Sequence, residues 1–145
     1  MSDEIKSRLL GIDYGLVRVG VAISDPLGMT AQPVTTLKAS STDQLITQIG
    51  GIVSERVIRK IVVGLPINMD GSEGPAAQGA REFADMLEAR LDVEVVLWDE
   101  RLSTVRAERA MLEGNLSRAK RARRRDVIAA QFILQSYLDA QGRPD

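Results

Sequence analysis

The sequence contains no cysteine and no histidine among its 145 residues. Without cysteine there is no disulfide, no thiol nucleophile and no thiolate metal site, which suits a reducing cytoplasm. Without histidine there is no Ser-His-Asp triad, no imidazole general base and no usual zinc ligand. The remaining chemistry must use carboxylates, lysine, arginine, hydroxyl groups, the backbone, and a metal such as Mg²⁺ or Mn²⁺ that prefers oxygen ligands.

Aromatic residues and long apolar runs are also scarce. With one tryptophan, two tyrosines and two phenylalanines, stacking of nucleobases on aromatic rings is a poor prospect. No apolar run approaches the roughly 20 residues that cross a bilayer, and residues 1–8 are polar rather than signal-like. We therefore expect a single domain over residues 1–145, located in the cytoplasm without a membrane partner, as a monomer or a weak homodimer.

The overall charge conceals a local cluster of cations. Nineteen basic against twenty acidic residues give a net charge of -1, which alone predicts no nucleic-acid partner. Six cations nevertheless fall within eight consecutive residues: Arg118, Lys120, Arg121, Arg123, Arg124 and Arg125. Without them the chain has 13 basic and 20 acidic residues, a net charge of −7. This basic stretch is typical of a protein that binds phosphates at one place, although a solvated charged loop would have the same composition.

The first third of the chain has the pattern of a β-hairpin. An apolar run covers residues 9–14, and period-two alternation over residues 17–24 predicts a second, half-buried strand. Gly15 and Leu16 between them predict a tight turn. Residues 33–37 predict a third strand, antiparallel and at a sheet edge if Pro33 begins it.

The rest of the chain alternates helices and strands. Strands are predicted over residues 60–65 and 93–98, and helices over residues 42–56, from Pro75 to about 91, over 103–112, and from Asp126 onward. A hairpin followed by strand-helix-strand units predicts an α/β fold. Its sheet would be mixed, an antiparallel β-hairpin plus parallel strands, with helices on both faces.

Asp13 is conspicuous because strand interiors rarely carry a carboxylate. It shares a strand face with Gly11 and Gly15, which have no side chains, so we expect open space around its carboxylate. A buried carboxylate is costly unless it is paired, hydrogen-bonded or bound to a metal. A salt bridge to Arg18 across the hairpin is one interpretation. The open face favours the other, metal or phosphate binding.

Asp99 and Glu100 follow the strand at residues 93–98. Binding sites in open α/β sheets form at the carboxyl ends of strands, so this position suggests a site. Adjacent strand residues point to opposite faces, and we expect at most one of the two to share a site with Asp13. Solvation of the strand end, or a pair between Glu100 and Arg101, would explain the same residues without a site.

Asp126 is expected to begin the last helix, where the helix dipole favours a carboxylate. It also shares a stripe with Ala129 and Ala130, whose small side chains would allow the helix to bring Asp126 over the first strand. Three converging carboxylates without histidine describe a site for hard divalent metals. Two such ions about 4 Å apart can activate water and stabilise the leaving oxygen in phosphodiester cleavage. The basic stretch would then hold a nucleic-acid backbone beside the metals.

Four blocks of sequence occur in an order that is specific to one family. They read GIDYG with RVGVAISD, then VVGLP with NMDGS, then DERLST, and finally Asp126 with Ala129-Ala130 and Ile133-Leu134. Together they resemble the YqgF/RuvX family over about residues 9–139. One departure is Val17, where the family commonly has a lysine; losing that cation would weaken a phosphate contact at the hairpin.

The resemblance implies an RNase H-like fold, close to that of RuvC, and a metal-dependent nuclease. Its implied reaction is trimming of the 5′ end of pre-16S rRNA in ribosome biogenesis, with pre-16S rRNA or a pre-ribosomal particle as the partner. An older family label, Holliday-junction resolvase, leaves branched DNA as an alternative substrate. The family's acidic set falls on Asp13, Glu100 and Asp126 as catalytic residues and ligands of Mg²⁺ or Mn²⁺, with Asp99 as a lesser candidate.

Arg18 and Arg101 are candidates to hold a phosphate or to orient a carboxylate, and together with the basic stretch they are the predicted nucleic-acid contacts. Recognition through backbone charge predicts strongly salt-dependent binding. Two alternatives stay open. One is an ATPase of the actin and sugar-kinase type, which would need a second domain to clamp the nucleotide. The other is a non-catalytic RNA-binding factor of ribosome assembly.

Overall fold

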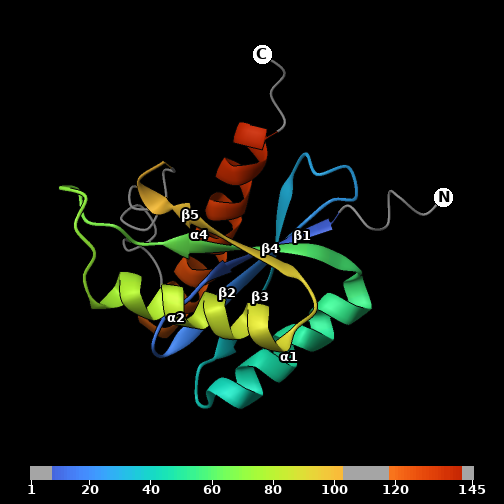
Figure 1. The fold of residues 1–145 in the computed structure, drawn as a ribbon, viewed down its shortest axis with the longest axis horizontal. Coiled ribbons are helices and arrows are strands. Elements are labelled where there is room, and N and C mark those ends of the chain that lie inside the picture. The colour runs from blue at the N-terminus through green and yellow to red at the C-terminus, as the bar shows by residue number, and fades with distance from the viewer. Residues whose placement is uncertain (1–7, 103–117, 142–145) are drawn as a thin grey trace.

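The computed structural model describes residues 8–102 and 118–141, with the backbone alone for 118–125. Five strands form one sheet in the order β3-β2-β1-β4-β5 (Figure 1). The strands are β1 (Arg8–Asp13), β2 (Arg18–Ser24), β3 (Ala31–Lys38), β4 (Ile58–Leu65) and β5 (Glu94–Asp99). The β1–β2 and β2–β3 pairs are antiparallel and the β1–β4 and β4–β5 pairs are parallel, which confirms the mixed sheet.

Three α-helices and a short 3-10 helix complete the described structure: α1 (Thr42–Arg56), α2 (Pro75–Arg90), η2 (Glu100–Leu102) and α4 (Arg118–Gln141). The starts of α1 and α2 agree with the sequence, because Ser41 accepts a hydrogen bond from the Gln44 N–H as an N-cap and Pro75 occupies the first turn of α2. None of these helices is long and apolar enough to cross a membrane. The helix predicted at residues 103–112 lies outside the described residues.

Period-two alternation distributes the strand side chains between two cores. Leu10 and Ile12 of β1 belong to a cluster with side chains of α1 and α2, including the fully buried Phe83. Leu9, on the other face of β1, belongs to a second cluster with the buried side chains of α4. Helices therefore cover both sheet faces, as predicted, with α1 and α2 on one side and α4 on the other (Figure 1).

The hairpin differs from its prediction at the turn. The ladder ends at the pair Asp13–Gly20, and residues 14–17 form a four-residue connection instead of a two-residue turn. Tyr14 leaves the ladder because its ring stacks on that of Phe83, with 4.4 Å between centroids. Val17 instead accepts a hydrogen bond from the Ala39 N–H through its carbonyl oxygen, at 2.9 Å.

β3 is the predicted antiparallel edge strand, but Pro33 lies inside it. The register shifts from the pair Val21–Thr35 to the pair Ala22–Pro33, so one residue of β3 is extra at this point. A proline cannot donate to the ladder, and an edge strand with an irregularity tolerates it. The strands predicted at residues 60–65 and 93–98 run over Ile58–Leu65 and Glu94–Asp99.

The prediction that Asp126 begins the last helix is wrong. α4 begins at Arg118, so the backbone of the basic stretch is helical. Alanine, arginine and lysine are among the best helix formers, and this composition continues the helix in the N-terminal direction. Asp126 lies about two turns inside α4, beyond the reach of the N-terminal dipole. The helix dipole therefore does not account for a carboxylate at this position.

Candidate active site

Asp13 is the last residue of β1 and is only 7% exposed. Its cross-strand partner in β2 is Gly20. On the other side, Gly64 of β4 directly follows Val63, the parallel partner of Ile12. The buried carboxylate is therefore flanked by two residues without side chains, and alternation places all three on the sheet face that α4 covers.

The two flanking glycines admit the other acidic residues. A Cβ atom at Gly20 would overlap the backbone oxygen of Asp126, and one at Gly64 would lie 2.8 Å from Oε2 of Glu100. Asp126 and Glu100 thus approach the positions on either side of Asp13. The structure brings all three predicted residues to one face, at the edge of the sheet where β1, β4 and β5 end.

The open space predicted beside Asp13 is not found at Gly11 or Gly15. A Cβ at Gly11 would meet Leu134 of α4 at 2.7 Å, and one at Gly15 would lie 2.6 Å from the backbone oxygen of Arg18. Gly11 serves close helix packing, and Gly15 serves the close approach of the hairpin backbone. The residues that sequence reasoning missed are Gly20 and Gly64, whose signal was a glycine inside each of two buried apolar strands.

Glu100 and Asp99 lie in different environments, as expected for adjacent residues at the end of a strand. Glu100 begins η2 and is 5% exposed, with its carboxylate against Gly64. Asp99 is bound by Arg101, whose Nη2 and Nε lie 2.8 and 3.1 Å from Oδ2. This hydrogen bond raises the pKa of the Arg101 guanidinium above its ordinary value. Of the two, Glu100 faces Asp13, and the carboxylate of Asp99 is engaged by a cation.

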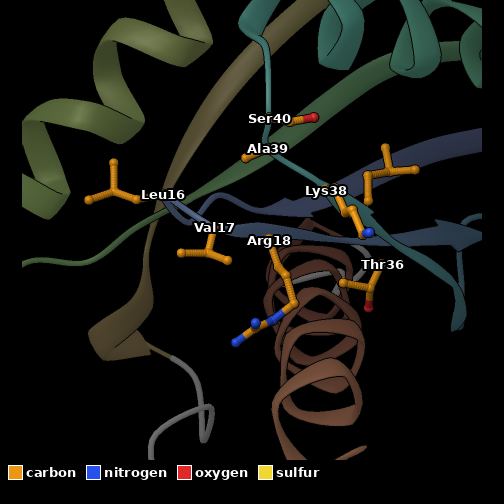
Figure 2. Close-up of a pocket in the computed structure, with 8 residues that line it drawn as sticks. Leu16, Val17, Arg18, Thr36, Lys38, Ala39 and Ser40 are labelled. Atoms are coloured by element: carbon orange, nitrogen blue, oxygen red, sulfur yellow. The ribbon is translucent and has the colours of Figure 1, made fainter. Parts of the chain in front are cut away.

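Arg18 connects the hairpin to α4. Its Nε donates to Oδ2 of Asp126 at 2.9 Å, with both side chains partly exposed. Figure 2 shows the Arg18 side chain extending from β2 toward the helix. Arg18 thus orients a carboxylate, one of its two predicted roles, and the carboxylate is that of Asp126. Among the described side chains, Arg18 is the one that forms an ion pair with Asp126.

The donor chemistry of this site fits Mg²⁺ or Mn²⁺, which prefer carboxylate oxygens. Asp13 and Glu100 are buried carboxylates, the kind of group that a cation can compensate. Among the described residues, however, no three acidic side chains lie close enough together to hold a metal ion. A site that includes Asp126 needs its carboxylate to move toward Asp13 and Glu100. The basic stretch lies in the same helix as Asp126, and its predicted contacts fall outside the described side chains.

Comparisons with known proteins agree with this architecture. A family model described as RuvX, Holliday junction resolvase, matches residues 7–140. The chain belongs to the RuvX family. It is 51% identical over 138 residues to a Myxococcus xanthus protein named "Putative pre-16S rRNA nuclease", covering 95% of this chain and 91% of the relative. A protein of the same name from Clostridium tetani is 53% identical over 133 residues, covering 92% of this chain and 96% of the relative.

Solved structures give the fold of this RuvX member. Thermus thermophilus RuvC in complex with a Holliday junction substrate has a TM-score of 0.60 at 14% identity, with 93% of this chain and 95% of that chain covered. The fowlpox virus resolvase with Holliday junction DNA has a TM-score of 0.54 at 10% identity, over 94% and 99% of the two chains. The fold is therefore that of the RuvC-like resolvases, which confirms the RNase H-like expectation.

Proposed function

We propose that this chain is a divalent-metal-dependent nuclease that trims the 5′ end of pre-16S rRNA in the cytoplasm, during ribosome biogenesis. The observation that carries the proposal is the placement of two buried carboxylates, Asp13 and Glu100, on the sheet face over which Asp126 crosses. The names of the relatives from Myxococcus xanthus and Clostridium tetani support pre-16S rRNA as the substrate. Family membership favours a nuclease over an ATPase of the sugar-kinase type.

In this proposal Asp13, Glu100 and Asp126 would hold Mg²⁺ or Mn²⁺ through their carboxylate oxygens. When bound, the metal activates water, which no imidazole can do in a chain without histidine. Arg18 holds Oδ2 of Asp126 and would keep this carboxylate oriented as it turns toward Asp13 and Glu100.

The cations near the carboxylates bind the substrate backbone in this proposal. Arg101 lies at the same sheet edge and can bind a phosphate once its pair with Asp99 opens. The basic stretch belongs to the same helix as Asp126, so an RNA backbone bound there would run toward the carboxylates. Asp99 remains the lesser candidate for the metal, because Arg101 already neutralises it.

Cleavage of a precursor-rRNA fragment that contains the 5′ processing site tests this function. The wild type is compared with Asp13→Asn in Mg²⁺, in Mn²⁺ and in EDTA, and a four-way DNA junction is run in parallel. Asp92→Asn is the matched control, because Asp92 is exposed and precedes β5 at the opposite edge of the sheet. We expect metal-dependent cleavage of the RNA by the wild type and by Asp92→Asn, and a loss of more than about 100-fold in Asp13→Asn.

The junction DNA represents the second candidate function, which has its own supporting observation. The matching family model carries the description Holliday junction resolvase, and the RuvC structure described above holds a Holliday junction substrate. Cleavage of the junction with intact RNA would favour this alternative. If neither substrate is cleaved while both variants still bind the RNA, the nuclease proposal is contradicted and a binding factor of ribosome assembly is favoured.

A further inference from the structure

A cavity of about 510 Å³ lies beside the candidate active site, between the β1–β2 connection and the end of β3. This volume falls within the roughly 300–1,000 Å³ that is typical of small-molecule sites. The hydrogen bond between the Ala39 N–H and the Val17 carbonyl joins its two walls. Arg18 lines the cavity and also binds Asp126, so the cavity and the candidate active site share a wall (Figure 2).

Two of the apolar residues that line the cavity are exposed to solvent, whereas Leu37 and Ala39 pack against the core. Leu16 is 85% exposed and Val17 is 67% exposed, and neither contributes to the two cores. Both belong to the four-residue connection after Asp13. Aliphatic side chains at the mouth of a cavity offer an apolar surface against which a flat nucleobase can pack. Such packing does not need the aromatic side chains that this chain has in small number.

The polar part of the lining carries a positive charge that no described carboxylate pairs with. Arg18 and Lys38 are cross-strand partners, and like charges in such a pair repel each other. Asp126 neutralises Arg18. Lys38 is exposed, and within the described part of the chain no carboxylate forms an ion pair with its ammonium group. The hydroxyl-bearing residues Thr36 and Ser40 also line the cavity. A cation, hydroxyl groups and an apolar wall together suit a nucleotide.

We propose that this cavity binds one nucleotide of the RNA strand, adjacent to the phosphate that is cleaved. The base packs against Leu16 and Val17, and Lys38 binds the phosphate of that nucleotide. The inference rests on the proposed function and adds a subsite to it. Because Arg18 separates the cavity from Asp126 by a single side chain, the bound nucleotide is an immediate neighbour of the scissile position.

Salt-dependent binding tests the phosphate contact. A short single-stranded RNA that spans the 5′ processing site is titrated in EDTA with proteins that carry Asp13→Asn, so that cleavage does not interfere. Adding Lys38→Gln should reduce the slope of log affinity against log salt by about 0.7, the value of one phosphate contact on a single strand. Lys38→Arg should retain the slope. Arg59→Gln, an exposed cation near the amino end of β4, is the matched control and should also retain it.

Photocrosslinking tests the base contact. A 4-thiouridine is placed in turn at each position beside the processing site, and the crosslinked peptide is mapped by mass spectrometry. We expect one position to crosslink to residues 16–18 or 36–40. An unchanged salt slope in Lys38→Gln, or crosslinks only elsewhere, would overturn the subsite even if wild-type protein still cleaves the RNA. If the wild type neither binds nor cleaves the RNA, the proposed function fails, and the subsite fails with it.

Discussion

The two halves of α4 cross the same face of the sheet and contact it in different ways. In the C-terminal half, Ile133 and Leu134 are fully buried, and the Tyr137 ring meets the Trp98 ring edge to face at 5.3 Å. The Tyr137 hydroxyl accepts a hydrogen bond from Lys60 at 2.9 Å. Farther toward the N-terminus, α4 crosses β2 at Asp126. The backbone of Asp126 lies against Gly20, and its carboxylate is bound to Arg18.

The C-terminal half of α4 thus contributes mainly to stability, whereas the N-terminal half carries the candidate site residue Asp126. The apolar half removes large side chains from water, which is the main favourable contribution to folding. The polar half places Asp126 against Gly20, where it contributes little apolar burial. Sites that break the ordinary rules of packing are those where function is expected. We therefore expect the C-terminal half of α4 to position Asp126 without contacting the substrate in the proposed function.

The largest effect on stability is expected in the apolar half. Leu134→Ala should lower the free energy of unfolding by about 2–5 kcal/mol, because the site is closed and cannot collapse around the cavity. Denaturant unfolding measures this change, and cleavage per folded molecule should stay at the wild-type level. Leu102→Ala, an exposed leucine after β5, should change stability by less than about 0.5 kcal/mol. Equal losses in the two variants would contradict the division of α4.

In the polar half, a single methyl group added at Gly20 should affect both stability and cleavage. Gly20→Ala places a Cβ where the Asp126 backbone oxygen lies, so α4 must move away from β2. We expect a loss of about 1–3 kcal/mol and, in contrast to Leu134→Ala, a loss of cleavage by the molecules that remain folded. Gly51→Ala in α1 is the control, since a Cβ there meets nothing within 4 Å. That helix should gain about 0.5–1 kcal/mol from the exchange. Cleavage at the wild-type level by Gly20→Ala would show that the position of Asp126 is not needed for the reaction.

Much of the fold could be predicted from local patterns. Period-two alternation in residues 17–24 and the apolar run in residues 61–65 predicted strands whose two faces meet helices on both sides. The start of α1 at Thr42 agrees with the predicted range of residues 42–56, and the structure adds Ser41 as its N-cap. The start of α4 could not be predicted this way, because a run of cations is compatible with both a loop and a helix. The hairpin turn was wrong because a tertiary contact, the stacking of Tyr14 on Phe83, decides it.

The candidate site was predicted as a set of residues but not as an arrangement. The motifs indicated Asp13, Glu100 and Asp126, and strand alternation predicted that at most one residue of the Asp99–Glu100 pair shares a site with Asp13. The pair between Arg18 and Asp126 joins residues 108 positions apart, and it depends on where α4 crosses β2. The local sequence does not determine where α4 crosses β2. The same applies to the roles of the glycines, which depend on the backbone that approaches each of them.

Removing Arg18 should have a smaller effect, confined to the polar half. In Arg18→Gln the Asp126 carboxylate loses the guanidinium that orients it, and we expect Mn²⁺ affinity to fall about 10-fold, as for other residues that orient metal ligands. Isothermal titration with Mn²⁺ measures this without any substrate. Arg101→Gln, which removes the partner of Asp99 instead, should leave the affinity unchanged. Tighter Mn²⁺ binding by Arg18→Gln would show instead that the guanidinium competes with the metal for Asp126.

The smallest effect is expected at the opposite edge of the sheet, in the turn after β2. The pKa of Asp25 is lowered from its ordinary value of 3.8, chiefly because its carboxylate accepts the backbone N–H of Thr30, and also that of Met29. A lowered pKa in the folded state stabilises the protein at pH values above 3.8, and this stability is lost as the pH falls through the lowered pKa.

Asp25→Asn should therefore lower the free energy of unfolding by less than about 1 kcal/mol at neutral pH, because solvent screens this largely exposed carboxylate, and the difference from the wild type should shrink below pH 3.8. Denaturant unfolding at a series of pH values measures both. Cleavage at neutral pH should not change, because β2 runs from the candidate site at Arg18 to the far edge at Ser24, before Asp25. A difference that stays constant with pH would mean that the ionised carboxylate is not what stabilises the turn. A loss of cleavage would mean that the turn at Asp25 influences the candidate site at the other end of β2. The division between stabilising and site residues would then apply to α4 but not to the sheet.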